Sequence, residues 1–192
     1  MPKKVLPTTM AAAALAALTV LPAVPAAAAA TAEVTIRVDR SYTETIQEWR
    51  GIPFTCPTNQ VLTGRMHTGD ENGPTTYYCS WILVNGEQAQ VLLGDWNTGQ
   101  RESRSNFVAP PDQAIAGRWH TGDENGTTKY RTAAIYWQGR QVRLTSPVSS
   151  GCAKESNCYS EAGAGRVMTG RSHTGDENGS TTYRYSLVTF EG

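Results

Sequence analysis

The stretch Gly64-Arg65-Met66-His67-Thr68-Gly69-Asp70-Glu71-Asn72-Gly73 occurs three times in this chain of 192 residues, each time with a different residue only at its third position. The second copy spans residues 117–126 and the third spans residues 170–179. Successive copies are 53 positions apart in both steps. Self-similarity at a fixed period is the sequence signature of a protein built from repeats.

This spacing divides most of the chain into three repeats of equal length. They are residues 34–86, 87–139 and 140–192, each closing on a glycine, with no insertion, deletion or Pro/Ser-rich linker between them. Independent modules normally show linkers and differ in length. We therefore expect residues 34–192 to form one closed domain with pseudo-threefold symmetry.

Within the first repeat the apolar residues alternate with polar ones, which is the period of a β-strand and not of a helix. We expect strands at Val34–Val38, at Gln60–His67 and at Thr75–Val84, and a fourth strand around Trp49–Phe54. The second and third of these flank a turn that ends in Asn-Gly, which is typical of a β-hairpin. No stretch of residues 34–192 has the pattern of an amphipathic helix. The sequence therefore predicts an all-β protein.

Three all-β architectures can be built from such repeats. A β-trefoil usually has shorter units, and a propeller usually needs about four blades. Three four-stranded sheets that face one another around a shared axis form a β-prism, and this architecture suits 53 residues best. The fold class that we predict is a single β-prism of three repeats.

The segment Cys56-Pro57-Thr58-Asn59-Gln60-Val61-Leu62-Thr63-Gly64, continued at Tyr77-Tyr78-Cys79-Ser80, resembles the repeat of the vitelline membrane outer layer protein 1 family. That family also has three repeats of similar length folded as a β-prism. It is richer in cysteine, and its hairpin turn differs from the turn found here. The resemblance implies a fold more than a function. The likeness of β-prisms to several plant lectins favours sugar binding by analogy alone.

The first thirty residues have the order of a secretory signal peptide. Lys3 and Lys4 form the positive start, residues 10–20 the apolar core, and residues 22–30 a tail of small residues that offers cleavage just before Thr31. An alanine-rich surface helix is the alternative. We expect a secreted protein without a membrane span, since the apolar run is shorter than a span needs. The alanine-rich leader and the preference for arginine over lysine suggest a bacterium of high GC content.

Composition excludes some partners and gives meaning to the cysteines. The 17 Lys+Arg balance the 17 Asp+Glu, so we expect no nucleic-acid partner. Disulfides persist outside the cell, which favours pairing of the four cysteines. Cys56 and Cys79 both belong to the first repeat and have no cysteine at the equivalent positions of the other two. Cys152 and Cys158 lie together in the third. We therefore predict the disulfides Cys56–Cys79 and Cys152–Cys158.

Twelve positions are identical in the three repeats, and turn geometry explains only part of them. Glycine, aspartate and asparagine suit a turn, but the arginine, histidine and glutamate of the motif are not explained in this way. Residues two apart on a strand share a face. The predicted ligand-binding residues, three equivalent sets, are Arg65, His67, Asp70, Glu71, Asn72 and Tyr77; Arg118, His120, Asp123, Glu124, Asn125 and Tyr130; and Arg171, His173, Asp176, Glu177, Asn178 and Tyr183.

Several interpretations of these sets remain open. They can be glycan pockets, because carboxylates, amides and guanidinium groups recognise sugar hydroxyls. They can be structural braces, in which Arg65 pairs with Asp70 or Glu71. An enzyme is disfavoured, since no repeated serine or cysteine accompanies the histidines. We expect no cofactor and no metal, because one acidic turn is shorter than an EF-hand loop and one histidine per repeat is too few for zinc.

We therefore predict a secreted, non-enzymatic, lectin-like protein that binds extracellular or cell-wall glycan at three equivalent hairpin sites. The alternative is a protein-interaction adaptor in a larger secreted, antagonistic or toxin complex. Aromatic residues peculiar to the second repeat, Trp96, Trp119 and Trp137, favour this alternative unless they only pack in the core.

Overall fold

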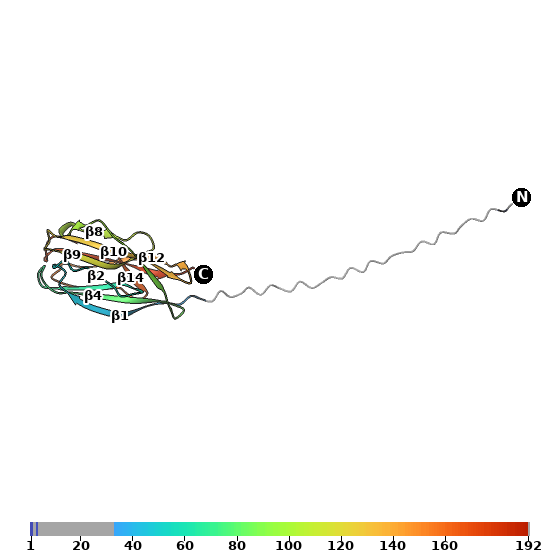
Figure 1. Cartoon of the computed structure of the whole chain (residues 1–192), viewed down its shortest axis with the longest axis horizontal. Helices are drawn as coiled ribbons and strands as arrows, with labels where there is room; N and C mark the ends of the chain where they lie inside the picture. The colour runs from blue at the N-terminus through green and yellow to red at the C-terminus, as the bar shows by residue number, and fades with distance from the viewer. Residues whose placement is uncertain (2, 4–32, 192) are drawn as a thin grey trace. The chain divides into compact units, whose positions relative to one another are not determined.

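The computed structural model describes residues 1, 3 and 33–191 (Figure 1). The predicted signal peptide lies outside the described residues except for Met1 and Lys3, and so does Gly192. Residues 33–191 form β-strands and one short 3-10 turn, η1(Glu102–Arg104), so the all-β prediction is confirmed. Among the described residues, no helix has the length and apolar character needed to span a membrane.

The strands form three antiparallel sheets, each built around one copy of the repeated hairpin. The first sheet contains β1(Ile36–Ile46), β4(Thr75–Val84), β3(Gln60–Thr68) and β13(Asn157–Glu161) in that order, with β5(Glu87–Gln88) paired to β4. The second contains β11(Arg140–Gln141), β10(Thr127–Trp137), β9(Gln113–Thr121) and β2(Phe54–Thr55), with β6(Gln90–Trp96) and β7(Gln100–Arg101) paired to β10. The third contains β12(Arg143–Cys152), β15(Ser180–Thr189), β14(Arg166–Thr174) and β8(Asn106–Val108).

The fourth strand of each sheet differs from the sequence prediction. A fourth strand was expected around Trp49–Phe54, but the strand found there is only Phe54–Thr55, and it pairs with β9 of the second repeat. In the same way β8 pairs with β14, and β13 pairs with β3. Each of these segments, β2, β8 or β13 with the residues just before it, thus completes the sheet of another repeat. We call them the crossover segments. A strand pairing there satisfies backbone groups that an open sheet edge would leave exposed.

The hairpin register brings the identical residues of each repeat together. Arg65 on β3 lies opposite Tyr77 on β4, and His67 lies opposite Thr75. The three motif strands β3, β9 and β14 also contact one another, so their inward faces meet inside the protein. One buried apolar cluster includes the three motif tyrosines Tyr77, Tyr130 and Tyr183, and Phe54 stacks on Tyr77 with 4.2 Å between ring centroids.

The repeated turn depends on two glycines with different tasks. Gly69 has a φ of 94°, in the left-handed region that favours glycine. At Gly73 a Cβ would lie 2.0 Å from the carbonyl oxygen of Thr68, so no other residue fits there without moving the backbone. The Asp70 carboxylate accepts the backbone N–H of Asn72 at 3.0 Å, which fixes the tip between them.

Both predicted disulfides are present. Cys56, which follows β2, is bonded to Cys79 on β4, and Cys152 on β12 is bonded to Cys158 on β13. Each bond joins a crossover segment to a strand of a different sheet. The disulfides therefore fix the segments that exchange between repeats.

Candidate functional site

Three arginines and three glutamates form a closed ring of ion pairs at the place where the three hairpins meet. Each arginine of the motif contacts two glutamates, and each glutamate contacts two arginines. The N–O distances are between 2.5 and 2.9 Å, and every residue is at most 7 % exposed. We call this cluster the arginine–glutamate ring; in order, its members are Arg65, Glu48, Arg118, Glu102, Arg171 and Glu155.

The ring corrects the predicted pairing of the motif arginine. In the brace interpretation Arg65 pairs with Asp70 or Glu71 of its own turn, but in the structure it pairs with Glu48 and Glu155, which lie on crossover segments. The turn carboxylates are too exposed to neutralise a buried guanidinium, whereas the crossover segments carry glutamates into the interior. The brace therefore links different repeats, not the two ends of one turn.

Electrostatics hold all six ring residues in their charged forms. Burial alone would raise the pKa of Glu48, but the guanidinium groups of Arg118 and Arg65 outweigh it and lower that pKa well below its usual range. Burial would lower the pKa of Arg65, yet the carboxylate of Glu48 raises it on balance. Three positive and three negative charges leave the ring neutral as a whole.

The motif tyrosines and histidines also point into the interior. Arg65 donates to the hydroxyl of Tyr183 at 3.1 Å, and Arg171 donates to that of Tyr130 at 3.3 Å. His67 is hydrogen-bonded through Nδ1 to Thr75 at 2.8 Å and through Nε2 to the backbone carbonyl of Asp70 at 2.9 Å. These side chains are buried, and their hydrogen bonds support the turns.

We expect the free energy of unfolding to fall as the pH is lowered from 7.5 to 6. Burial, followed by the nearby arginines, lowers the pKa of His67 and of His120. A lowered histidine pKa in the folded protein stabilises the fold at pH values above the pKa of the unfolded chain, which is near 6.5. This stability is lost as the pH falls below that value toward the lower pKa of the folded protein, because the unfolded chain then binds protons that the folded protein does not. The loss is at most about 1.4 kcal/mol per pH unit for each histidine. Urea unfolding at the two pH values measures it.

The control for this prediction is the double variant His67→Gln/His120→Gln. Glutamine does not titrate, so the difference in unfolding free energy between pH 7.5 and 6 should shrink, whatever the absolute stability of the variant. An undiminished difference would show that other groups cause the pH dependence.

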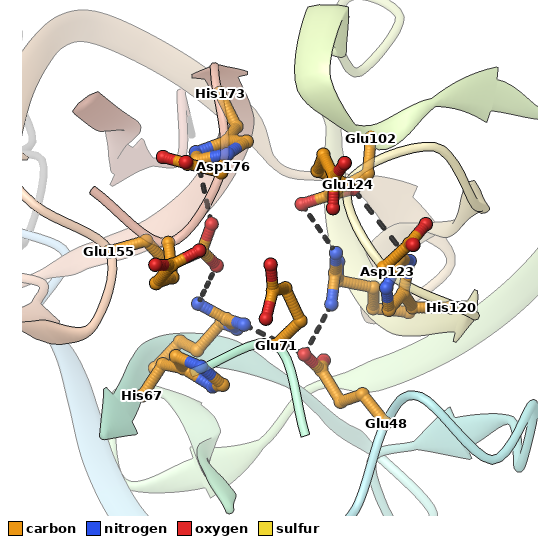
Figure 2. A pocket seen from close by; sticks show the side chains of 13 residues that line it. Glu48, His67, Glu71, Glu102, His120, Asp123, Glu124, Glu155, His173 and Asp176 are labelled. Atoms are coloured by element: carbon orange, nitrogen blue, oxygen red, sulfur yellow. Dashed lines mark hydrogen bonds and ion pairs between the residues drawn. The ribbon is translucent and has the colours of Figure 1, made fainter. Parts of the chain in front are cut away.

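Above the ring lies a small cavity that we call the central pocket (Figure 2). Its volume is about 30 Å³, which is the space of one or two water molecules or of a single ion. Ring residues and all three motif histidines line it, together with five acidic side chains of the turns, Glu71, Asp123, Glu124, Asp176 and Glu177. Residues of all three repeats thus share one pocket.

The glutamates of the three turns converge on this pocket. Glu71, Glu124 and Glu177 are half-buried, and Figure 2 shows the Glu71 side chain reaching into its middle. A backbone hydrogen bond in the turn lowers the pKa of Glu71, but partial burial and the carboxylates of Glu177 and Glu124 raise it on balance. The three groups therefore gather negative charge above a neutral ring.

The predicted site residues thus separate into three kinds. The arginines, histidines and tyrosines are buried, although Arg65, Arg118 and the three histidines also line the central pocket, and the half-buried turn glutamates line it too. The aspartates and asparagines Asp70, Asn72, Asp123, Asn125, Asp176 and Asn178 are exposed around it. Asn125 and Asn178 each donate a side-chain hydrogen bond of 2.6 Å to the glutamate before them. Three separate pockets were expected, and the glutamates meet in one.

Sequence reasoning missed the ring glutamates. Glu102 and Glu155 occupy equivalent positions of their repeats, but Glu48 is one residue early, since Trp49 stands at the equivalent position. A search for identical positions therefore passes over all three. The arginine identical in each repeat was the available signal, because an arginine that becomes buried needs an acidic partner.

Comparison with known proteins identifies no relative. No family model matches the sequence, and neither a curated protein nor a solved structure gives a significant match. The resemblance of the first repeat to the vitelline membrane outer layer protein 1 family therefore stays a prediction. Function has to be inferred from the chemistry of the site itself.

Proposed function

We propose that this protein is a secreted, non-enzymatic binding protein that recognises extracellular glycan with the end of the molecule formed by the three repeated turns. One observation carries the proposal. The tip Asp-Glu-Asn is identical in three turns, and the turns surround a common pocket above a buried ring that holds them in place. A site that is fixed before the ligand arrives loses less entropy on binding.

The chemistry of this end favours a neutral or amino-bearing glycan. Carboxylates accept hydrogen bonds from sugar hydroxyls, and side-chain amides both accept and donate them. The exposed residues of these kinds are Asp70, Asn72 and their equivalents. Six carboxylates on three turns repel uronic acids and phosphorylated sugars. A protonated amino sugar gains an attraction at the same place.

We also propose an architecture for the three sheets. We propose that the three sheets are the faces of a β-prism with pseudo-threefold symmetry and that the turns lie at one end of its axis. The mutual contacts of β3, β9 and β14 and the cyclic exchange of fourth strands support this architecture. The signal-peptide pattern and the two disulfides support secretion.

A protein-interaction adaptor is the second candidate, and one observation favours it. A cleft of about 250 Å³ is lined by Pro53, Trp96, Trp119 and Lys129, and the neighbouring Ile52 is 53 % exposed. Met66 and Ser172 stand at the positions equivalent to Trp119, so the other two hairpins lack the tryptophan that lines this cleft. Aromatic residues are enriched where proteins bind one another.

A glycan array and affinity capture from culture supernatant test the two functions together. We expect the wild-type protein to bind neutral or amino-bearing glycans and to lose most of this binding in Asp70→Asn/Asp123→Asn/Asp176→Asn. A Trp119→Ser variant should bind the same glycans normally. The glycan function would be rejected in favour of the adaptor if the wild-type protein bound no glycan and instead captured a protein that the Trp119→Ser variant does not capture.

A further inference from the structure

One edge of each sheet is formed by a strand from the start of a repeat. These edge strands are β1, β6 and β12, and their partner strands are β4, β10 and β15 respectively. The outward backbone groups of an edge strand can pair with a strand of another chain. We propose that two copies of this protein associate through β6, which pairs antiparallel with β6 of the second copy.

The middle of β6 is apolar, unlike the other two edges. Leu92 and Leu93 are neighbours in the sequence and are 57 % and 44 % exposed. At the equivalent positions stand Asp39 and Arg40 on β1, and Thr145 and Ser146 on β12. The exposed apolar residues of those two strands, Tyr42 and Val148, are single. Of the three edge strands, which the structure describes in full, β6 alone presents two adjacent apolar side chains.

The other two edges carry residues that oppose pairing with another chain. Charged side chains and proline are the usual means by which natural sheets keep an edge unpaired. The four charged residues of β1 are Arg37, Asp39, Arg40 and Glu44. The strand β12 contains Pro147, which has no N–H to donate. The single charge of β6 is Asp95, near the end of the strand. Pairing is therefore favoured at β6 over the other two edges.

The backbone of β6 also offers groups that can pair. The N–H of Val91 faces away from β10, since it donates to the side chain of Asn59 at 3.1 Å. Hydrogen-bonded and non-hydrogen-bonded pairs alternate along an antiparallel ladder, so the N–H and C=O of Leu93 face the same outward side. At the equivalent position of the third edge, the carbonyl of Ser146 accepts a hydrogen bond from Arg166 at 2.6 Å. That edge is thus partly closed by its own side chain.

A second copy of the same strand fits these features. A twofold axis at Leu93 would place this residue opposite its counterpart, and their outward N–H and C=O groups would bond reciprocally. Apolar surface of the leucines of both copies would leave water. Val91 would lie opposite Asp95, so no like charges meet. One edge thus satisfies both chains, as a twofold contact requires.

The contact is small, so we expect a dimer that dissociates on dilution. Interfaces below about 1,200 Å² of total buried area are typical of transient complexes. One pair of short strands belongs to this class.

The dimer would carry its two repeated-turn ends on opposite sides. The strand β10 begins just after the second repeated turn and leads away from it, so the antiparallel β6 runs toward that turn. Two β6 strands that run in opposite directions place the two ends apart. If these ends bind glycan, which rests on the proposed function, the dimer cross-links two glycan-bearing surfaces instead of binding one surface twice.

Sedimentation velocity of the purified protein without glycan, from about 1 µM to about 1 mM, tests the pairing. We expect the wild type to pass from monomer to dimer over this range. The variant Leu92→Asp/Leu93→Arg should stay monomeric throughout. It carries the residue pair of the first edge and keeps the net charge, so its melting temperature at the lowest concentration should equal that of the wild type.

The matched control is Val108→Asp/Val148→Arg, which places the same two residues at exposed apolar positions of the third sheet. It should dimerise like the wild type. A wild type that stays monomeric, species larger than a dimer, equal dimerisation of the β6 variant, or loss of the dimer in the control would overturn the proposal. Because no glycan is present, failure of glycan recognition leaves this result unaffected.

Discussion

Replacement of Arg118 by methionine is expected to destabilise the protein by about 3–5 kcal/mol, the effect of removing one partner from a buried ion pair. Arg118 contacts Glu48 at 2.5 Å and Glu102 at 2.9 Å, and all three residues are buried. Methionine fills a similar volume, so packing changes little. The two glutamates, however, would each lose one guanidinium group and leave the ring with a net negative charge inside the protein.

The matched control for this substitution is Arg37→Met. The Arg37 side chain is 69 % exposed and pairs with Asp39 on the surface, where an ion pair contributes at most about 1 kcal/mol. Arg118→Lys should fall between the two, since lysine keeps the charge but cannot contact two carboxylates with a planar fork. Urea unfolding followed by tryptophan fluorescence measures all three. Equal losses in Arg118→Met and Arg37→Met would show that the ring does not stabilise the fold.

Removal of the disulfide between Cys56 and Cys79 is expected to have the second largest effect. The bond closes a loop of 23 residues, and the entropy that it removes from the unfolded chain corresponds to about 3 kcal/mol. The bond between Cys152 and Cys158 closes only 6, which corresponds to about 2 kcal/mol. Both sulfurs of the first bond are also buried, so Cys56→Ala/Cys79→Ala leaves space in the core as well.

The same denaturation experiment compares the two alanine pairs. We expect Cys56→Ala/Cys79→Ala to be the less stable protein. The order would be reversed if the exchange of β13 into the first sheet depended mainly on the short disulfide, which lies at the start of that strand. That result would contradict the account based on loop length.

The hairpins were predictable because their signal is local. The strand predicted at Thr75–Val84 has the bounds of β4, and the strand predicted at Gln60–His67 is one residue shorter than β3. Alternation of apolar residues and a turn ending in Asn-Gly identify such strands without knowledge of the rest of the chain. The fourth strands depend on a distant partner, and neither the two residues of β2 nor their pairing with β9 is encoded locally.

The candidate site was predictable only in part, for a related reason. Identity across repeats singled out Arg65, His67 and Glu71, but it does not separate a buried support from an exposed ligand contact. Burial decides this, and burial depends on how the three strands meet. Glu48 carries no repeat signal, since it is displaced by one residue, although its carboxylate is a member of the ring.

A crystal structure of the protein with a bound neutral oligosaccharide tests most directly whether the three turns form one binding end. We predict sugar hydroxyls in contact with Asp70, Asn72 and their equivalents around the central pocket, above an arginine–glutamate ring that remains closed. Sugar bound only in the cleft of Trp96 and Trp119, with the turns unoccupied, would contradict it.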